Sequence, residues 1–548
     1  MTRPKTTGKT TTSRKPRPIG CVAFVGAGPG DHDLLTVRAV ELLAKADVVV
    51  TESQDADFVR RFCRDDVEVV DGSLGDDGQP LSHAVRARLV VKAAKSGGSV
   101  VRLLDGDPFL YATGSEEAVG CAKAEIPFEV VPGVSSITAV PAYAGIPLTS
   151  AKHREVRVVN VAEGIRSSAD WSSIAAGTAT LVLLSATQVI GDVAKALIAA
   201  GRSPETPVAM TQLGTTTSQR TVTSTLERIA ADVKAAKLAP PTITVVGDTV
   251  VLRETLSWFE TKSLFGWRVL VPRTKEQAGA LSDRLRAYGA VPEEVPTIAV
   301  EPPRTPQQME RAIKGLVTGR YEWVAFTSRN AVKAVRERFE EYGLDARAFA
   351  GIKVATVGEQ TAADLLAWGI KPDLVPSGEQ SAAGLLEDWP PYDPVFDPID
   401  RVFLPRADIA TENLVAGLVE RGWEVDDVTA YRTVRAAPPA APVRDAIKTG
   451  KFDAVVFTSS STVRNLVGIA GKPHASTVIA VIGPATAKTA EEHGLQVDVL
   501  AAQPSVEDLV DALADHGAAR RAAMLEAGQP VTKPSERKPS ARRKVRAE

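Results

Sequence analysis

Apolar and polar positions along the chain follow two patterns that alternate almost throughout. Short apolar runs, for example residues 21–25 and 128–131, have the length of buried strands. Between such runs lie segments with apolar residues at helical spacing, for example residues 34–46. Because strands alternate with helices, the sequence predicts an α/β architecture.

The pattern restarts near residue 267. Residues 257–267 end one series of strands and helices, and RVLVPRT at residues 268–274 opens another. A chain of 548 residues is also too long for a single ordinary core. We therefore predict one domain over residues 21–262 and a second over residues 263–516.

The second domain contains a degenerate internal repeat with three paired motifs. They are LVPRT at 270 and FLPRA at 403, WVAFTSRNAV at 323 and AVVFTSSSTV at 454, and VATVGEQTA at 354 and IAVIGPATA at 479. Their offsets of 133, 131 and 125 residues are similar, which predicts two lobes of like construction. Ligands of open α/β sheets gather at the carboxyl ends of strands, where these motifs stop.

Charge is distributed unevenly between the ends and the middle of the chain. The net charge is −2, yet residues 1–20 hold six Lys or Arg and no acid, and residues 517–548 hold nine against three acids. Both stretches are poor in large apolar residues, so we predict disordered basic tails over 1–20 and 517–548. Weak binding of the tails to nucleic acid or to an acidic partner is the alternative. No groove-reading motif stands out, so we do not expect nucleic-acid binding.

Apolar runs and cysteines bound the class of protein further. The apolar runs are strand-sized, so we expect no membrane span. Cys21, Cys63 and Cys121 have no metal-ligand spacing and leave one thiol over in any disulfide scheme. We therefore expect a cytoplasmic protein without a metal site.

The first glycine-rich turn, VGAGPGD at residues 25–31, has two glycines of a dinucleotide-binding turn. Asp31 stands where that motif has its third glycine, and Pro29 removes one backbone N–H. Both features weaken a phosphate site. A dinucleotide, another ligand, and a turn that only reverses the chain remain the alternatives at this point.

Further turns give the first domain a family resemblance. LLDGDPF at 103–109, VVPGVSSITAVPAYAGIPLT at 130–149 and TPVAMTQLGTTTSQRTVTSTL at 206–226 follow in order. With the first turn they resemble the S-adenosylmethionine-dependent methyltransferases of tetrapyrroles, most closely uroporphyrinogen-III C-methyltransferase. The resemblance implies a two-lobed fold, a homodimer, and S-adenosyl-L-methionine bound between the lobes. The matching cofactor-binding positions are Pro29, Asp105, Gly106, Asp107, Leu110, Ser135, Ser136 and Gly214.

The first domain also departs from the family pattern, at Thr51, Glu52, Asp105, Thr113, Ser150 and Ser185. Thr113 stands where the family has the arginine of its GRGGEE motif. Glu52 replaces an aspartate and still offers a carboxylate that can accept the proton from the methylated ring. We therefore take Glu52 as the candidate catalytic residue.

The second domain resembles uroporphyrinogen-III synthase. The motifs that carry the resemblance are LVPRT, FTSRNAV, VGEQTA, VTAYRTV, FTSSSTV and IGPATA. It implies two flavodoxin-like lobes, over residues 266–301 plus 434–516 and over residues 302–433. It also implies cyclisation of hydroxymethylbilane without a cofactor.

Substrate carboxylates must be bound in a domain that is not basic. Hydroxyls and backbone N–H groups at strand ends and helix starts can do so, although each Ser or Thr there could equally be a helix cap. The candidates are Thr327, Ser328, Thr361, Ser459, Ser460 and Thr486. Tyr431 matches the family's tyrosine and could donate a hydrogen bond to the departing hydroxyl, or could simply pack with its own hydroxyl at the surface.

Together the two resemblances imply a fusion that makes uroporphyrinogen III and methylates it to precorrin-2. Two alternatives stay open. In the first, only the synthase is active and the methylase-like half is a degenerate binding or dimerisation platform. In the second, the chain is a tetrapyrrole-sensing regulatory protein.

Overall fold

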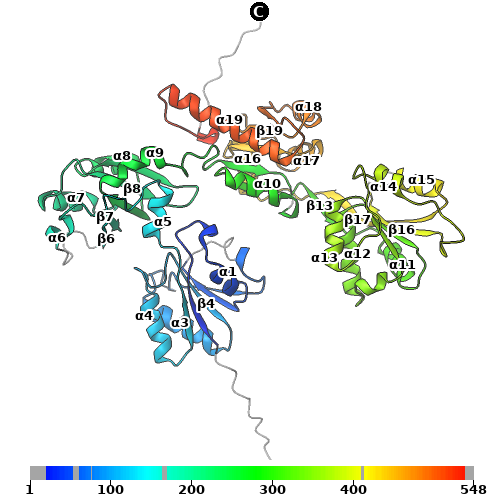
Figure 1. Ribbon diagram of the computed structural model, residues 1–548, viewed down its shortest axis with the longest axis horizontal. Helices are drawn as coiled ribbons and strands as arrows, with labels where there is room; N and C mark the ends of the chain where they lie inside the picture. Colours follow the sequence, from blue (N-terminus) through cyan, green and yellow to red (C-terminus); the bar gives the residue numbers. More distant parts are fainter. Residues whose placement is uncertain are drawn as a thin grey trace, which may run out of the picture. The chain divides into compact units, whose positions relative to one another are not determined.

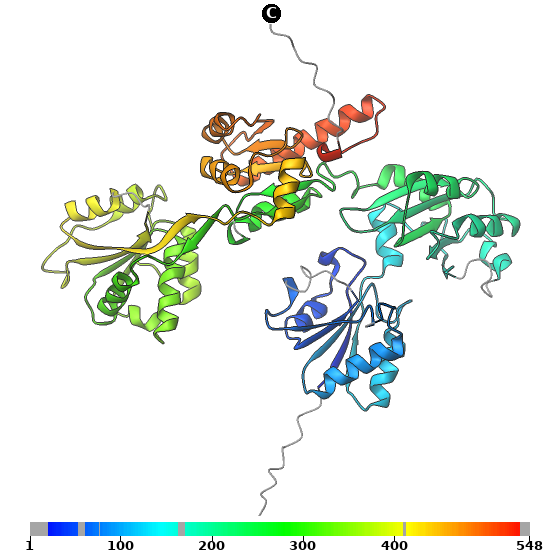
Figure 2. The ribbon, with the colours of Figure 1, turned by 180° about the vertical axis from the view of Figure 1, so that it is seen from behind.

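A computed structural model describes residues 20–52, 61–75, 77–162, 170–273, 275–408 and 413–536, with the side chains of 275–278 left out. The chain divides into two compact units, each with two sheets (Figures 1 and 2). The first comprises Met1–Gly266 with Tyr288–Ala290, and the second the remainder. The three-residue segment joins the first unit because its Tyr288 and Gly289 carbonyls accept hydrogen bonds from Leu264 and Gly266.

The first sheet of the first unit is wholly parallel, with strand order β3-β2-β4-β1-β5. Its strands are β1 (Val22–Gly26), β2 (Val48–Thr51), β3 (Glu68–Asp71), β4 (Val100–Leu104) and β5 (Phe128–Val131). Its helices are η1 (His32–Leu34), α1 (Val37–Leu43), α3 (His83–Lys95) and α4 (Gly114–Lys123). Apolar clusters cover both faces, which explains why β1 and β4 are buried along their full length.

The helix expected over residues 34–46 is shorter than its apolar pattern. The Thr36 hydroxyl accepts a hydrogen bond from the Ala39 N–H and caps α1, while Asp31 caps the separate turn η1. Local side-chain caps therefore divide one apolar stripe into two elements.

The second sheet of the first unit is mixed, with order β6-β7-β10-β8-β9 and β10 antiparallel to both neighbours. Its strands are β6 (Val156–Asn160), β7 (Thr180–Leu184), β8 (Pro207–Gln212), β9 (Arg220–Thr225) and β10 (Thr242–Val246). Its helices are α6 (Trp171–Ala175), α7 (Ile190–Ala199), α8 (Ile229–Ala236), η3 (Asp248–Leu252) and α9 (Arg253–Leu256). Helix α5 (Ser136–Tyr143) follows the first sheet but packs Ile137 and Val140 against this one.

The second unit begins and ends in a parallel sheet of order β12-β11-β18-β19-β20. Its strands are β11 (Arg268–Val271), β12 (Val291–Glu294), β18 (Ala454–Phe457), β19 (Val478–Val481) and β20 (Val499–Leu500). Its helices are α10 (Lys275–Ala287), α16 (Ala441–Thr449), α17 (Ser460–Ala470), α18 (Pro484–Glu492), α19 (Val506–Glu526) and η5 (Pro534–Glu536).

The other sheet of this unit has order β13-β17-β16-β14-β15. Its strands are β13 (Ile298–Glu301), β14 (Trp323–Phe326), β15 (Lys353–Thr356), β16 (Arg401–Ala407) and β17 (Glu424–Arg435). Its helices are α11 (Pro306–Val317), α12 (Arg329–Glu341), η4 (Ala346–Phe349), α13 (Glu359–Trp368), α14 (Ala382–Asp388) and α15 (Asn413–Glu420). The predicted lobe of residues 266–301 plus 434–516 is wrong for residues 298–301, because β13 pairs antiparallel with the end of β17 and belongs to this sheet.

The two lobes of the second unit repeat each other in detail. The Val354 N–H of β15 donates to the Asp373 carboxylate at 2.7 Å, and the Ile479 N–H of β19 donates to Asp498 at 2.8 Å. The sequence repeat did not include these aspartates, which share its offset of 125 residues. The lobes therefore have a common construction beyond the three motifs.

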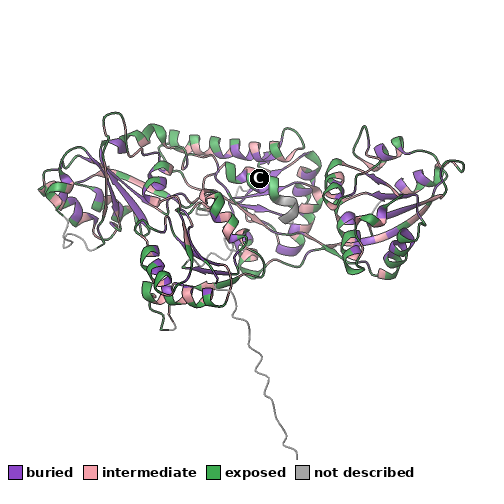
Figure 3. Cartoon of the chain, turned by 60° about the horizontal axis from the view of Figure 1, so that its bottom comes forward, coloured by how far each residue is buried: buried purple, intermediate pink, exposed green. Residues whose placement is uncertain are grey.

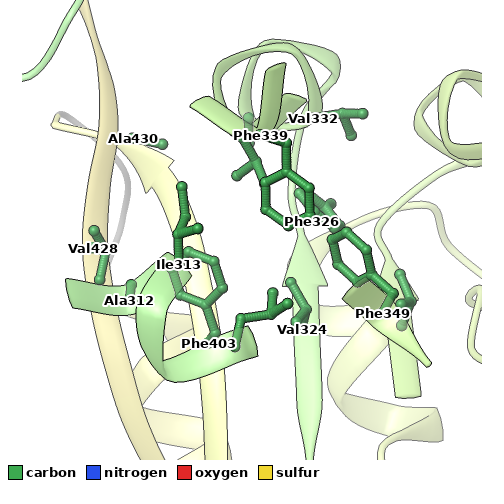
Figure 4. Packing of buried hydrophobic residues seen from close by; sticks show 14 of the residues in the cluster. Ala312, Ile313, Val324, Phe326, Val332, Phe339, Phe349, Phe403, Val428 and Ala430 are labelled. Carbon is green, nitrogen blue, oxygen red and sulfur yellow. The ribbon is translucent and has the colours of Figure 1, made fainter. Parts of the chain in front are cut away.

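One face of the β14 sheet packs against α11 and α12 (Figure 4), and the opposite face packs against α14 and α15. Phe326 and Phe403 from neighbouring strands meet Ile313 of α11 and Phe339 of α12. Figure 3 shows the same division throughout, with strands mostly buried and helices exposed on one side. This rigid base positions the strand ends that carry the candidate site residues.

The predicted disordered tails, residues 1–20 and 517–548, include residues that the structure shows to be ordered. Helix α19 continues through residues 517–526, although its buried residues end at Gly517. The last turns are alanine-rich, which favours a helix without burial, and Arg520 donates to the Thr532 carbonyl at 3.2 Å. The Ser535 N–H then donates to the buried Asp453 carboxylate at 2.9 Å. At the other end Gly20 is already buried, whereas residues 1–19 and 537–548 lie outside the described part.

Within the described ranges, none of the helices combines the length and apolar character that crossing a membrane requires.

Asp453→Ala should loosen η5, which follows α19. The Asp453 carboxylate, 1% exposed, also accepts the Arg268 N–H at 2.7 Å, so its loss leaves two backbone donors without their acceptor. We expect local stability to fall by about 1–3 kcal/mol. Hydrogen exchange of residues 506–536 would measure this, with the exposed Asp445→Ala in α16 as the control; equal exchange in the two variants would contradict it.

Candidate active sites

Three strand ends of the first sheet meet backbone against backbone. A Cβ atom on Gly26, at the end of β1, would lie 2.5 Å from both the Gly106 carbonyl oxygen and Gly133 Cα. Gly28 and Gly106, both with positive φ, also form a two-way bridge with N···O distances of 2.8 and 3.3 Å. Only glycine permits this approach, so the turn after β1 and the turn after β4 form one backbone surface.

Asp107 joins this surface to the turn after β5. Its carboxylate accepts hydrogen bonds from the Phe109 N–H at 2.9 Å and the Gly133 N–H at 3.1 Å. Asp107 therefore holds two turns together, and its expected contact with a cofactor stays a prediction.

Most other expected cofactor residues lie around the same turns. Ser135 caps α5 and Ser136 begins it, and a Cβ atom on Gly106 would lie 3.9 Å from the Ser136 nitrogen. Gly214 follows β8 and is buried so closely against Val140 that a side chain would clash with the valine methyl groups. Pro29 is half-buried beside these turns, whereas Leu110 is exposed.

The turn after β1 also bonds directly to the loop after β8. The Asp31 N–H donates to the Thr215 hydroxyl at 3.0 Å, and the Tyr143 hydroxyl donates to the Asp31 carboxylate at 2.8 Å. Partial burial, together with the hydrogen bond to the Asp31 carboxylate, holds the pKa of Tyr143 well above its ordinary value. Asp31 thus fixes the turn after β1 against Thr215 and Tyr143. The sequence did not predict this role.

Left-handed backbone is concentrated at the strand ends of this unit. Among the described residues, six that are not glycine have positive φ, and Glu125 and Lys237 simply follow helices. The other four, in loops after β4, β7 and β8, are Tyr111, Ser185, Leu213 and Thr215, with φ of 55°, 60°, 48° and 66°. Such strain persists where surrounding structure enforces it and is frequent at ligand sites.

A chain of charges runs from the core to the ends of β2 and β4. The Arg102 guanidinium and the Glu117 carboxylate are fully buried and joined at 2.7 Å. Arg102 also reaches Glu52 at 2.6 Å, and Arg86 of α3 reaches Glu52 at 3.2 Å. Glu52, the expected catalytic residue, is therefore the half-exposed end of this cluster.

We did not single out Arg86, Arg102 or Glu117 from the sequence. The one available signal was Arg102 within the apolar run VVRLL, because an arginine in a buried strand needs an acidic partner. Nothing in the sequence says which acid supplies it.

Asp105 adds an acidic group to the strand ends that carry Glu52. Desolvation by the surrounding protein raises the pKa of the Asp105 carboxyl, the Glu52 carboxylate raises it further, and Arg102 opposes both. The turns themselves, residues 25–31, 105–107, 132–136 and 213–216, contain no lysine or arginine. This donor set fits a cationic ligand with an uncharged nucleoside better than a pyrophosphate.

In the second unit, expected residues of the β14 lobe follow the adjacent parallel strands β14 and β15. Thr327 directly follows β14, Ser328 caps α12, and Thr361 is buried in the first turn of α13. The Ser328 hydroxyl accepts the Ala331 N–H at 3.2 Å and lies 2.9 Å from the Tyr431 hydroxyl. The fold thus brings Ser328 and Tyr431 together over 103 residues of sequence.

A β-bulge aims Tyr431 at this place. Arg406 pairs with Thr429 and Ala407 with Tyr431, so Ala430 is an extra residue in β17. Consecutive residues of a regular strand face opposite sides, yet Ala430 and Tyr431 pack in the same apolar cluster. Tyr431 is 7% exposed, so its ring is packed and its hydroxyl is satisfied by Ser328 rather than by the surface.

The β18 lobe presents the corresponding residues in the same way. Ser459 caps α17 through a capping box, Ser460 accepts from Thr489 and donates to the Ala485 carbonyl, and Thr486 is buried at the start of α18. Arg273 donates to the Thr458 hydroxyl at 2.8 Å, and burial lowers the pKa of Arg273. Capping and binding are compatible here, and the binding roles stay predictions.

Comparison with known proteins decides the family. A family model described as Uroporphyrinogen-III synthase HemD matches residues 279–511, and one described as Tetrapyrrole (Corrin/Porphyrin) Methylases matches residues 21–230. The "Porphyrin biosynthesis protein HemD" of Ruminiclostridium josui is 31% identical over 508 residues, 91% of this chain and 98% of that protein. This chain belongs to the family of fused tetrapyrrole methylases and uroporphyrinogen-III synthases.

Two further relatives each match less than half of this chain. The "Siroheme synthase" of Ectopseudomonas mendocina (strain ymp) is 40% identical over 250 residues, 45% of this chain and 54% of that protein. This chain therefore spans about half the length of that relative. The uroporphyrin-III C-methyl transferase of Thermus thermophilus, solved with S-adenyl homocysteine, is 30% identical with a TM-score of 0.36, over 42% of this chain and all of that one.

The family assignment confirms the fold class and both enzyme classes expected from the sequence. The methylase half has one parallel and one mixed sheet, and the synthase half has two repeated lobes. In the described ranges, no group of three or more His, Cys, Asp or Glu could hold a metal ion.

Arg102→Leu should destabilise the methylase half, because it leaves the Glu117 carboxylate buried without its main partner. Breaking a buried pair in this way costs about 3–5 kcal/mol. Hydrogen exchange of β4 and α4 would measure the loss. Arg38→Leu, which breaks an exposed pair with Glu129, is the control; a similar effect of both variants would contradict the assigned role.

Proposed function

We propose that this fusion catalyses two consecutive reactions of tetrapyrrole synthesis. The synthase half cyclises hydroxymethylbilane to uroporphyrinogen III. The methylase half then methylates uroporphyrinogen III with S-adenosyl-L-methionine to precorrin-2. The observation that carries the proposal is that the glycine surface, the four left-handed residues and the Glu52 cluster gather at the strand ends of the methylase half.

The backbone of the glycine turns would hold S-adenosyl-L-methionine, with Pro29, Asp105, Gly106, Ser135, Ser136, Leu110 and Gly214 around it. When bound, this cofactor supplies an electrophilic methyl group. The absence of lysine and arginine from the four turns avoids repulsion of a sulfonium cation, and the Asp105 carboxyl favours it when ionised. The chain contributes chiefly by orienting the two reactants.

Glu52 would accept the proton that the methylated pyrrole carbon releases. Its carboxylate is held by Arg102 and Arg86, and it is 41% exposed, so it is both oriented and accessible. The general-base role requires a carboxylate within hydrogen-bond reach of the proton on that carbon, and we propose Glu52 for it.

In the synthase half, Tyr431 would donate a hydrogen bond to the departing hydroxyl of hydroxymethylbilane. The bulge and Ser328 fix its orientation. Hydroxyls and N–H groups at the helix starts, from Thr327, Ser328, Thr361, Ser459, Ser460 and Thr486, would bind the substrate carboxylates. The homodimer and the cytoplasmic location implied by the sequence stay predictions.

Product analysis tests the whole proposal. With hydroxymethylbilane alone the chain should form uroporphyrinogen III, and with added S-adenosyl-L-methionine the product should gain two methyl groups. Chromatography and mass spectrometry identify both. If uroporphyrinogen I is the sole product, both activities are refuted and the sensing role is left. If the III isomer forms but gains no methyl group, the platform alternative is favoured.

Tyr431→Phe should slow formation of uroporphyrinogen III by about 10²-fold, because loss of the hydroxyl removes the proposed donor to the leaving group. The spontaneous I isomer should then accumulate. Tyr392→Phe in the same lobe is the control, since Tyr392 packs on Trp423 away from these strand ends. An unchanged rate with Tyr431→Phe would remove Tyr431 from the mechanism.

A further inference from the structure

The arginine that the family resemblance places at position 113 is missing, but another arginine reaches that point. The Arg86 guanidinium, from α3 and 27 residues away in the chain, donates to the Thr113 hydroxyl at 3.4 Å. We propose that Arg86 is a positioning residue of the methylase site, supplying from α3 the guanidinium that the chain lacks at Thr113. The inference rests on the proposed methyltransferase function.

The Arg86 guanidinium is fixed on several sides. Its Nε donates to the Gly72 carbonyl at 3.0 Å, its Nη2 lies 3.2 Å from Glu52, and its Nη1 lies 4.0 Å from Glu117. The side chain is 11% exposed, which is far less than a surface arginine. A planar guanidinium with three directed contacts orients its partners as well as neutralising them.

Arg86 contributes something that Arg102 cannot. Arg102 holds Oε1 of Glu52 at 2.6 Å, but its Nε and Nη2 also hold Glu117, so it reaches only that oxygen. Arg86 takes the second oxygen, Oε2. With one guanidinium on each oxygen, the plane of the Glu52 carboxylate is set at the mouth of the site.

Variants of the full chain separate this role from simple packing. Arg86→Leu should lower kcat for methyl transfer to uroporphyrinogen III by about tenfold or more, with the KM for S-adenosyl-L-methionine little changed, because Glu52 loses its orientation. The kcat of Arg86→Lys should lie between those of the wild type and Arg86→Leu, since a lysine keeps the positive charge but not the planar set of N–H donors. Arg88→Leu, an exposed arginine two residues further along α3, should behave as the wild type.

A relocated arginine gives the sharpest test. Thr113→Arg combined with Arg86→Leu should regain most of the lost kcat, because residue 113, which Arg86 contacts in the wild type, then carries the guanidinium itself. Full activity of Arg86→Leu, or no recovery in the double variant, would overturn the inference.

If the wild-type chain transfers no methyl group, the proposed function fails, and the Arg86 role is then decided by stability. Unfolding midpoints of Arg86→Leu, Glu52→Gln and the double variant form a cycle that measures their coupling. A non-additive cycle supports the orienting contact of Arg86 on Glu52, and additive shifts overturn the inference.

Discussion

Neighbouring parallel strands end at the same edge of a sheet, and all the proposed sites of this chain depend on that constraint. In the methylase half it brings together the turns after β1, β4 and β5. In the synthase half it places the starts of α12 and α13 side by side, and likewise those of α17 and α18. Short polar motifs far apart in the sequence become single surfaces because their strands are neighbours.

The two halves use that edge with different chemistry. In the methylase half, glycines without side chains let the turns contact one another. Residues with left-handed backbone conformation turn the loops after β7 and β8. The synthase half adds hydroxyls at helix starts, where N–H groups already point outward. A backbone surface without basic groups suits a cation, whereas hydroxyl-capped helix starts suit carboxylates.

Buried charge is the costly part of the methylase half. Taking Arg102 and Glu117 out of water carries a desolvation penalty that their pairing must offset, so the pair alone is weak evidence for stability. The pair also affects the site, because Arg102 contacts Glu52 as well as Glu117. The buried charges therefore orient the half-exposed Glu52 carboxylate at the end of β2. Asp105 shares this environment, which explains why its pKa responds to both groups.

Apolar periodicity and motif order in the sequence determined the α/β class, the division near residue 267, the internal repeat and the family, because these depend on local pattern and chain order. The expected cofactor turns and the helix starts of the synthase half also follow from motifs that lie within a few residues of each other. Composition predicted a disordered tail from residue 517, but α19 continues to Glu526, since alanine-rich turns extend a helix whose earlier turns are packed in the lobe. Only the tertiary structure decided that Arg86 meets Thr113, that Arg102 pairs with Glu117, and that a bulge turns Tyr431 toward Ser328. These contacts join separate elements, and strand order, register and an inserted residue set which side chains meet.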